Sequence, residues 1–274
     1  MLRLFFLTVP DEHPKYQQAA SIIGKNPGVG MRPGQADQKL DSSMIFLVRN
    51  DNADNPTDEF GEGLTNADWA KRYDMFLEKY DNVTGTNSDC SNIDPEKEAC
   101  RFNKADLGAC GQHPYGYLVS GGKTVVDPCV LIKINRIYGW KPQEYSDQDL
   151  EDAQKLEEGY PEDQMPPEVA DMIKGNGKKI YIHCEGENPF DKENLKGAMT
   201  YFPSDQGISF DYFPYQHTHR NYHNPLVAVK FSGLTPGVLY HVQCKLWAKE
   251  VRHSKKERAG LVHFEIFLDD TIRE

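Results

Sequence analysis

The stretch His241-Val-Gln-Cys-Lys-Leu-Trp-Ala248 decides the fold, because apolar side chains alternate in it with mostly polar ones. A period of two residues predicts a β-strand with one buried face, and that face carries Cys244. One strand of this kind needs partners to cover its apolar face, so the rest of the chain has to supply further strands.

Similar patterns recur on both sides of this stretch. Residues 130–135 and 262–268 alternate in the same way, and residues 226–231 are apolar except for Lys230. A short strand is also expected at residues 44–48. Turn residues separate the segments, as at Leu234-Thr-Pro-Gly237. Several short strands without long helices between them predict a mainly β protein with an antiparallel β-sandwich.

One amphipathic helix is expected at residues 65–80. Thr65 and Asp68 have the spacing of a capping box, with Asp in the position of Glu. Apolar side chains then fall on one face, and charged side chains lie elsewhere. We interpret this stripe as core packing; it comprises Trp69, Tyr73, Phe76, Leu77 and Tyr80.

Two other regions are irregular. Residues 10–64 are rich in Pro, Gly, Asn and Asp, which argues against a helix and indicates an extended segment. Residues 146–178 are acidic and broken by prolines, so an exposed excursion with one or two short helices is expected there.

The cysteines indicate the compartment. They are even in number and none has the Cys-x-x-Cys spacing of a zinc or redox motif. Such cysteines in a polar, loop-rich chain predict three disulfides, which persist outside the cytosol. The residues are Cys90, Cys100, Cys110, Cys129, Cys184 and Cys244.

The charge of the chain excludes some partners. The formal net charge of −11 over 274 residues argues against nucleic acid and against anionic membrane surfaces. Residues 1–9 are apolar apart from Arg3 and Thr8, but they are too short for a membrane span or a signal peptide. We interpret them as the remnant of a longer membrane helix or as an unstructured start.

No catalytic constellation stands out. Gly122-Lys-Thr124 lacks the glycine that a phosphate-binding loop requires five residues earlier. His217, His219 and His223 could serve a metal, but surface or packing roles are favoured because no carboxylate partner is evident. We therefore expect neither a metal nor a cofactor. Asn82-Val-Thr84 is a glycosylation sequon, and an extracellular location favours its use.

Several ordered motifs together identify a family. Cys100-Arg-Phe102 is followed by Leu107-Gly-Ala-Cys110, and Ile134-Asn-Arg-Ile-Tyr-Gly-Trp140 by Cys184-Glu-Gly-Glu-Asn188. Tyr212-Phe-Pro-Tyr215 and Pro225-Leu-Val-Ala-Val229 complete the series. From about Leu7 to the C-terminus the chain resembles the beta subunit of the sodium/potassium-transporting ATPase, in its invertebrate branch. It departs from the family at Gln216-His-Thr-His219, where the family usually has an aromatic residue and then Gly-Lys.

The resemblance implies an immunoglobulin-like sandwich in a glycosylated ectodomain at residues 65–274, preceded by an extended juxtamembrane segment at residues 10–64. It also implies the cysteine pairs Cys90–Cys100, Cys110–Cys129 and Cys184–Cys244. Sequence reasoning without the resemblance leaves the pairing open.

The implied function is non-catalytic. We expect an accessory subunit that helps a P-type ATPase alpha subunit to fold and reach the plasma membrane, where it modulates cation transport. Membrane association would come through the missing N-terminal helix or through the partner. Aromatic residues concentrate binding energy, so the candidate contact residues are Tyr212, Phe213, Tyr215 and Tyr222. Burial between the sheets is an equally good interpretation of these rings. A pump-independent cell-adhesion ectodomain is the alternative function.

Overall fold

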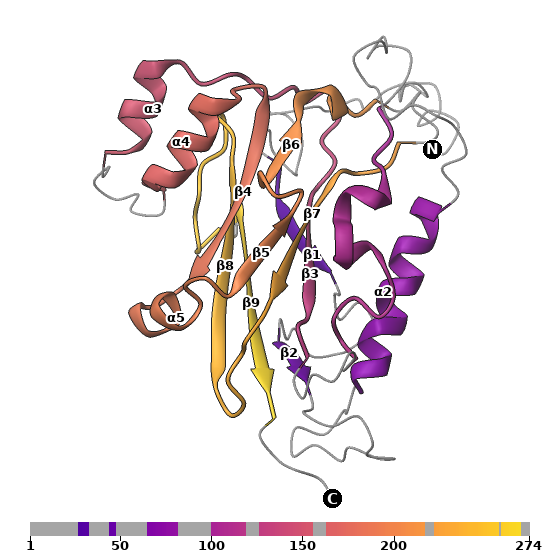
Figure 1. Cartoon of the computed structure of the whole chain (residues 1–274). Coiled ribbons are helices and arrows are strands. Elements are labelled where there is room, and N and C mark those ends of the chain that lie inside the picture. The colour runs from indigo at the N-terminus through magenta and orange to yellow at the C-terminus, as the bar shows by residue number, and fades with distance from the viewer. Residues whose placement is uncertain are drawn as a thin grey trace, which may run out of the picture.

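The computed structural model describes residues 27–32, 44–47, 65–81, 100–118, 126–155, 163–216, 222–257 and 259–269. Two β-sheets form its centre (Figure 1). The four-stranded sheet has the order β1-β3-β7-β5, and its strands are β1 (Val29–Arg32), β3 (Cys129–Ile134), β7 (Leu226–Phe231) and β5 (Met199–Phe202). The five-stranded sheet has the order β2-β9-β8-β4-β6, and its strands are β2 (Met44–Leu47), β9 (Leu261–Leu268), β8 (Leu239–Trp247), β4 (Lys179–Gly186) and β6 (Gly207–Ser209).

The sheets pack face to face, so the predicted sandwich is confirmed. Phe231 of β7 and Phe264 of β9 meet edge to face across the interface, with ring centroids 6.0 Å apart. Described strand pairs are antiparallel with one departure, because β2 runs parallel to β9. The segment expected to be extended, residues 10–64, contributes β1 to one sheet and β2 to the other.

Helices cover the outer faces of both sheets (Figure 1). The four-stranded sheet is covered by α2 (Asn66–Asp81) and by the 3-10 helix η3 (Lys104–Gly111). The other side carries α3 (Asp147–Ala153), α4 (Pro167–Gly175) and α5 (Pro189–Asn194), and a second 3-10 helix, η5 (Phe210–Tyr212), follows β6.

This covering corrects the expected half-buried strands. In β3 the alternation predicts that Leu131 faces away from the core, but Leu131 is fully buried because α2 lies over that face. In β8, Gln243, Lys245 and Trp247 are also buried, although they were expected on the polar face. Both strands therefore have two covered faces, which a period of two residues does not reveal.

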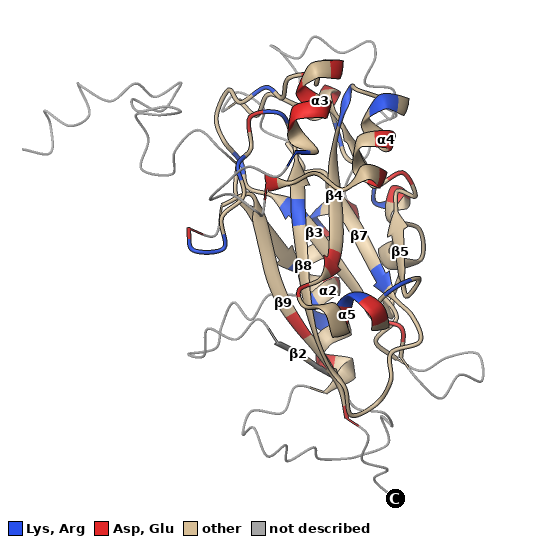
Figure 2. Ribbon diagram, turned by 90° about the vertical axis from the view of Figure 1, so that its left-hand side faces the viewer, with Lys and Arg blue, Asp and Glu red and all other residues tan. Residues whose placement is uncertain are grey.

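The acidic excursion contains the two short helices that were expected. It is less exposed than predicted, because Leu150, Val169 and Ile173 form a small cluster with Tyr181 and Trp247 on the outer face of the sheet. Asp147, Glu151 and Asp152 of α3 remain exposed, and Figure 2 shows red on this helix.

The helix α2 is confirmed, together with its N-terminal cap. The side-chain hydroxyl of Thr65 accepts from the Asp68 backbone N–H at 3.1 Å, and the Asp68 carboxylate accepts from the Thr65 N–H at 2.9 Å. Trp69, Tyr73 and Leu77 of the predicted stripe are 0–1 % exposed. Phe76 is the stripe member that stays half-buried.

The cap gives a pH-dependent prediction. Hydrogen bonding from Thr65 lowers the pKa of Asp68, so the carboxylate stabilises the fold above its unfolded pKa of about 3.9. That contribution is lost as the pH falls through the lower folded value. Thr65→Ala should cost about 1 kcal/mol at pH 7. The difference from wild type should shrink as the pH falls below about 3.9, because protonation of Asp68 weakens the hydrogen bond that the Thr65 hydroxyl donates to its carboxylate. Urea unfolding of both proteins across this range checks it, and a difference independent of pH would contradict it.

Candidate partner-binding surface

Two disulfides fix the frame around the candidate residues. Cys110 at the end of η3 is bonded to Cys129 at the start of β3, and Cys184 of β4 to Cys244 of β8. These bonds match two of the pairs that the resemblance implies. Cys100 is also disulfide-bonded, but Cys90 lies outside the described residues, and so does the sequon at Asn82.

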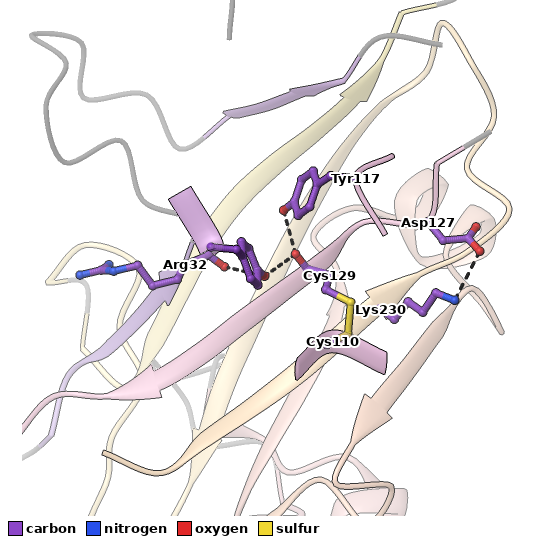
Figure 3. The surroundings of a disulfide bond; sticks show 7 residues. Arg32, Cys110, Tyr117, Asp127, Cys129 and Lys230 are labelled. Atoms are coloured by element: carbon purple, nitrogen blue, oxygen red, sulfur yellow. Dashed lines mark hydrogen bonds and ion pairs between the residues drawn. A yellow bond between two sulfur atoms is a disulfide. The ribbon is translucent and has the colours of Figure 1, made fainter. Parts of the chain in front are cut away.

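The backbone carbonyl of Cys129 joins the first disulfide to α2 (Figure 3). It accepts a hydrogen bond from the Tyr117 hydroxyl at 2.8 Å and another from the Tyr73 hydroxyl of α2. The Tyr73 oxygen also lies 3.2 Å from the carbonyl of Arg32 in β1. Burial raises the pKa of Tyr73 well above its ordinary value, so its hydroxyl keeps its proton and remains a donor. The helix, the disulfide and two strands are thus locked together.

The four aromatic candidates lie at the end of η5 and in the segment that leads from it to β7. Tyr212 is half-buried and packs its ring 6.0 Å from that of Phe102. Phe213 meets Trp140 edge to face at 5.1 Å. These contacts hold each ring by one side and leave part of it exposed, so both rings are ordered before any partner arrives.

Tyr215 and Tyr222 form a pair, with ring centroids 5.0 Å apart. The guanidinium of Arg136 lies 5.2 Å from the centroid of each ring, within the range of a cation–π contact. Arg136 also donates to the Asn224 side chain at 2.6 Å and to the Tyr222 carbonyl at 3.2 Å. Sequence reasoning missed Arg136, because its hydrogen-bond partners Tyr222 and Asn224 lie 86 and 88 residues further along the chain.

The four candidate contact residues differ in how far their side chains are exposed. Tyr222 is 7 % exposed, so the core interpretation holds for this residue in the unassembled chain. Tyr212, Phe213 and Tyr215 are half-buried. Burial raises the pKa of Tyr212 to about 12, so its hydroxyl stays protonated at neutral pH and can donate to a partner. The structure therefore leaves three ordered aromatic side chains that a second protein can reach.

The other motifs singled out in the sequence lie partly within the described residues. In the described part of the chain, no group of three or more His, Cys, Asp or Glu side chains is arranged to hold a metal ion. His223 packs its ring 5.4 Å from that of Tyr80, whereas His217, His219 and Gly122-Lys-Thr124 lie outside the described residues. A cavity of about 230 Å³ lies beside Cys129, and its charged side chains Asp127 and Lys230 pair with each other at 3.4 Å.

These features define a class: a disulfide-stapled β-sandwich with ordered aromatic side chains near its surface. Comparison with known proteins then gives the family. The profile of the family described as "Sodium / potassium ATPase beta chain" matches residues 1–264, and the chain belongs to this family. It is accordingly a non-catalytic, beta-type pump subunit.

The relatives support this assignment. The chain is 31% identical to "Sodium/potassium-transporting ATPase subunit beta-2" of Drosophila melanogaster, over 97% of this chain and 78% of the relative. It is 30% identical to "Probable sodium/potassium-transporting ATPase subunit beta-3" of Caenorhabditis briggsae, over 98% and 74%. The human "Sodium/potassium-transporting ATPase subunit beta-2" is 27% identical, over 96% and 78%.

Members of the family are membrane-associated pump subunits with an extracellular domain. Within the residues that the structure describes, no helix combines the length and the apolar character needed to cross a membrane.

Proposed function

We propose that this chain assembles with the catalytic alpha subunit of a P-type sodium/potassium-transporting ATPase, assists its folding, export and membrane delivery, and modulates its cation transport. The observation that carries the proposal is the family match over residues 1–264. The physical basis is mass action, because a partner that binds the assembled state and not the unfolded one stabilises the assembled state.

The fold suits this role. One disulfide holds β3 of the four-stranded sheet and another joins β4 to β8 within the five-stranded sheet. Helices cover the outer faces of both sheets. The sandwich is therefore rigid and loses little conformational freedom when it docks. Residues 65–274 act as the ectodomain and residues 10–64 as the juxtamembrane segment. We place the ectodomain on the extracellular side of the plasma membrane, reached through the secretory pathway, with Asn82 glycosylated and Cys90 bonded to Cys100.

Within this proposal, Tyr212, Phe213 and Tyr215 contact the alpha subunit. Rigid aromatic side chains that are already packed on one side bury a large area at small entropic cost. Tyr222 does not reach the partner itself. Its buried ring packs against Tyr215 and holds that side chain in position.

Alanine substitution tests the aromatic contact. Tyr215→Ala should lower recovery of the alpha subunit about 5- to 30-fold, because an aromatic interface residue is typically worth about 1–2 kcal/mol. Co-expression with an alpha subunit followed by affinity purification through a tag on this chain measures the recovery. Tyr145→Ala is the matched control, because Tyr145 is also half-buried but packs against the cluster beside α3 and α4. Equal losses for the two variants would contradict the contact.

The same purification separates the pump role from the adhesion role. Recovery of the alpha subunit with the wild-type chain supports the proposal. If no alpha subunit is recovered and the chain instead binds copies of itself on neighbouring cells, the pump-independent adhesion ectodomain would be favoured.

A further inference from the structure

Four basic side chains gather beside the aromatic candidates, and we name this group the basic surface. It consists of Arg32 at the end of β1, Lys79 in the last turn of α2, Lys133 of β3 and Arg136 just after β3. Three separate elements and one loop therefore contribute to the basic surface, and no local sequence pattern predicts it.

Specific contacts hold these cations together. The Lys79 ammonium lies 4.1 Å from the ring centroid of Phe76, and the Arg32 guanidinium lies 5.5 Å from the same ring. Lys133 stands opposite Gly30 of β1, and its Cε would be 3.1 Å from a Cβ added at that glycine. A side chain at position 30 would displace Lys133, so the glycine leaves the space that the lysine occupies.

The basic surface has no acidic counterpart in the described part of the chain. None of its four cations lies within 4 Å of a carboxylate there, although the chain carries a formal net charge of −11. Two acidic side chains of α2, Asp74 and Asp81, have partners away from the basic surface. Asp81 pairs with Lys104 at 2.7 Å, and Asp74 accepts from the Tyr115 hydroxyl at 2.7 Å.

This arrangement opposes folding. Burial lowers the pKa of Lys133, and the positive charges of Arg32, Lys79 and Arg136 lower it further. Lys79 is exposed at the surface, and partial desolvation together with the charges of Arg136 and Arg32 lowers its pKa. Groups that repel one another in the isolated chain destabilise it, and such local conflicts are characteristic of functional sites.

The chemistry selects the kind of ligand. Arginine and lysine donate charge-assisted hydrogen bonds to carboxylates. Arg136 already donates through Nε and Nη2 to Asn224 and Tyr222, so it adds mainly its positive charge. Three of the four cations lie against aromatic rings, and such mixed contacts suit side chains of a protein better than an extended polyanion. The strongly negative chain as a whole disfavours a nucleic acid or an anionic bilayer.

We propose that the basic surface docks an acidic segment of the alpha subunit, whose Asp and Glu carboxylates neutralise Lys79, Lys133 and the two arginines. This step rests on the proposed function, because it places the acidic segment in that subunit. Arg136 links the two surfaces, since its guanidinium contacts the rings of Tyr215 and Tyr222.

A double neutralisation tests this docking site. The variant Lys79→Gln with Lys133→Gln should recover about 10-fold less alpha subunit than wild type, since charge pairs at an interface are worth upward of about 1.5 kcal/mol when close. Its melting temperature should stay equal or rise, because the substitutions remove like-charge repulsion. Loss of binding without loss of stability is the result that a merely structural role would not give.

The matched control is Lys174→Gln with Lys196→Gln. Both lysines are exposed; one lies in α4 and the other just after α5, and Figure 1 shows these helices on the side away from α2. It makes the same change in net charge and should leave recovery unchanged. Raising the salt concentration should weaken the wild-type complex more than the Lys79 and Lys133 variant, because screening acts on the charges that the variant lacks.

The outcomes separate the inference from the function. Failure of the wild-type chain to recover the alpha subunit would overturn the proposed function itself. Wild-type recovery with no loss in the Lys79 and Lys133 variant, or with equal loss in the control, would overturn the basic surface alone. Loss of heparin binding or of phosphatidylserine-vesicle binding in that variant, with full recovery of the alpha subunit, would assign the cations to a glycan or a lipid and also overturn it.

Discussion

Replacing Cys184 and Cys244 together by alanine is expected to lower the free energy of unfolding by about 4 kcal/mol. The bond closes a loop with a sequence separation of 60 residues, so its loss frees a long stretch of the unfolded chain. The two cysteines face each other in the register of β4 and β8, within the five-stranded sheet. The Tyr201 hydroxyl of β5 accepts from the Cys184 N–H at 3.0 Å, which ties the other sheet to the same point.

The second described disulfide provides the comparison. Cys110 and Cys129 are separated by 19 residues, and the same chain-entropy argument gives about 3 kcal/mol for this bond. Unfolding by urea, monitored by tryptophan fluorescence, should therefore rank the Cys184 and Cys244 variant below the Cys110 and Cys129 variant. The opposite order would show that contacts near Cys129 outweigh loop closure.

The wild-type protein under reducing conditions gives an independent check. Cleavage of the described disulfides should destabilise the chain more than either double variant alone, because the loops that they close are distinct in sequence. No change of stability on reduction would contradict both estimates and the oxidising compartment that they presuppose.

Local signals predicted the fold where the deciding contacts are local. The capping pair Thr65 and Asp68 and the aromatic period that follows gave α2 within one residue of its observed start. The apolar run at residues 226–231 coincides with β7. In both cases the information lies within a few residues, and the helix or strand follows from it.

Features that depend on contacts between distant parts of the chain could not be predicted from the sequence. Nothing in residues 129–134 says that α2 will cover Leu131, and nothing in residues 44–47 says that β2 will run parallel to β9. The cysteine pairs came from the resemblance alone. The basic surface escaped prediction for the same reason, because Arg32, Lys79 and Lys133 belong to three elements that meet only in the folded chain.

The candidate site was predicted in part. The sequence placed aromatic residues at 212–222 but could not separate exposed rings from buried ones, since both interpretations need the same residue types. Tyr222 is buried because it packs between Arg136 and Tyr215, and that contact depends on a loop following β3.

Trp69→Ala is expected to destabilise the chain by about 3–5 kcal/mol, the typical range for removing a large buried aromatic side chain. Trp69 is 1 % exposed, and its ring stacks near that of Tyr117, whose hydroxyl holds the Cys129 carbonyl. The cavity left by the indole lies where α2 packs on the four-stranded sheet, so the loss should weaken the attachment of the helix. Met75→Ala is the matched control on the same helix, because Met75 is 70 % exposed and should change the stability by less than about 0.5 kcal/mol.

Urea unfolding followed by far-ultraviolet circular dichroism measures both variants, because the signal does not depend on the tryptophan that is removed. A cost below about 1 kcal/mol for Trp69→Ala would mean that the site collapses around the missing ring and that α2 is a dispensable cover. A large cost would mean that α2 is part of the folding unit. The helix would then hold Lys79 and Phe76 in place beside β1 and β3, and the basic surface would depend on the packing of Trp69.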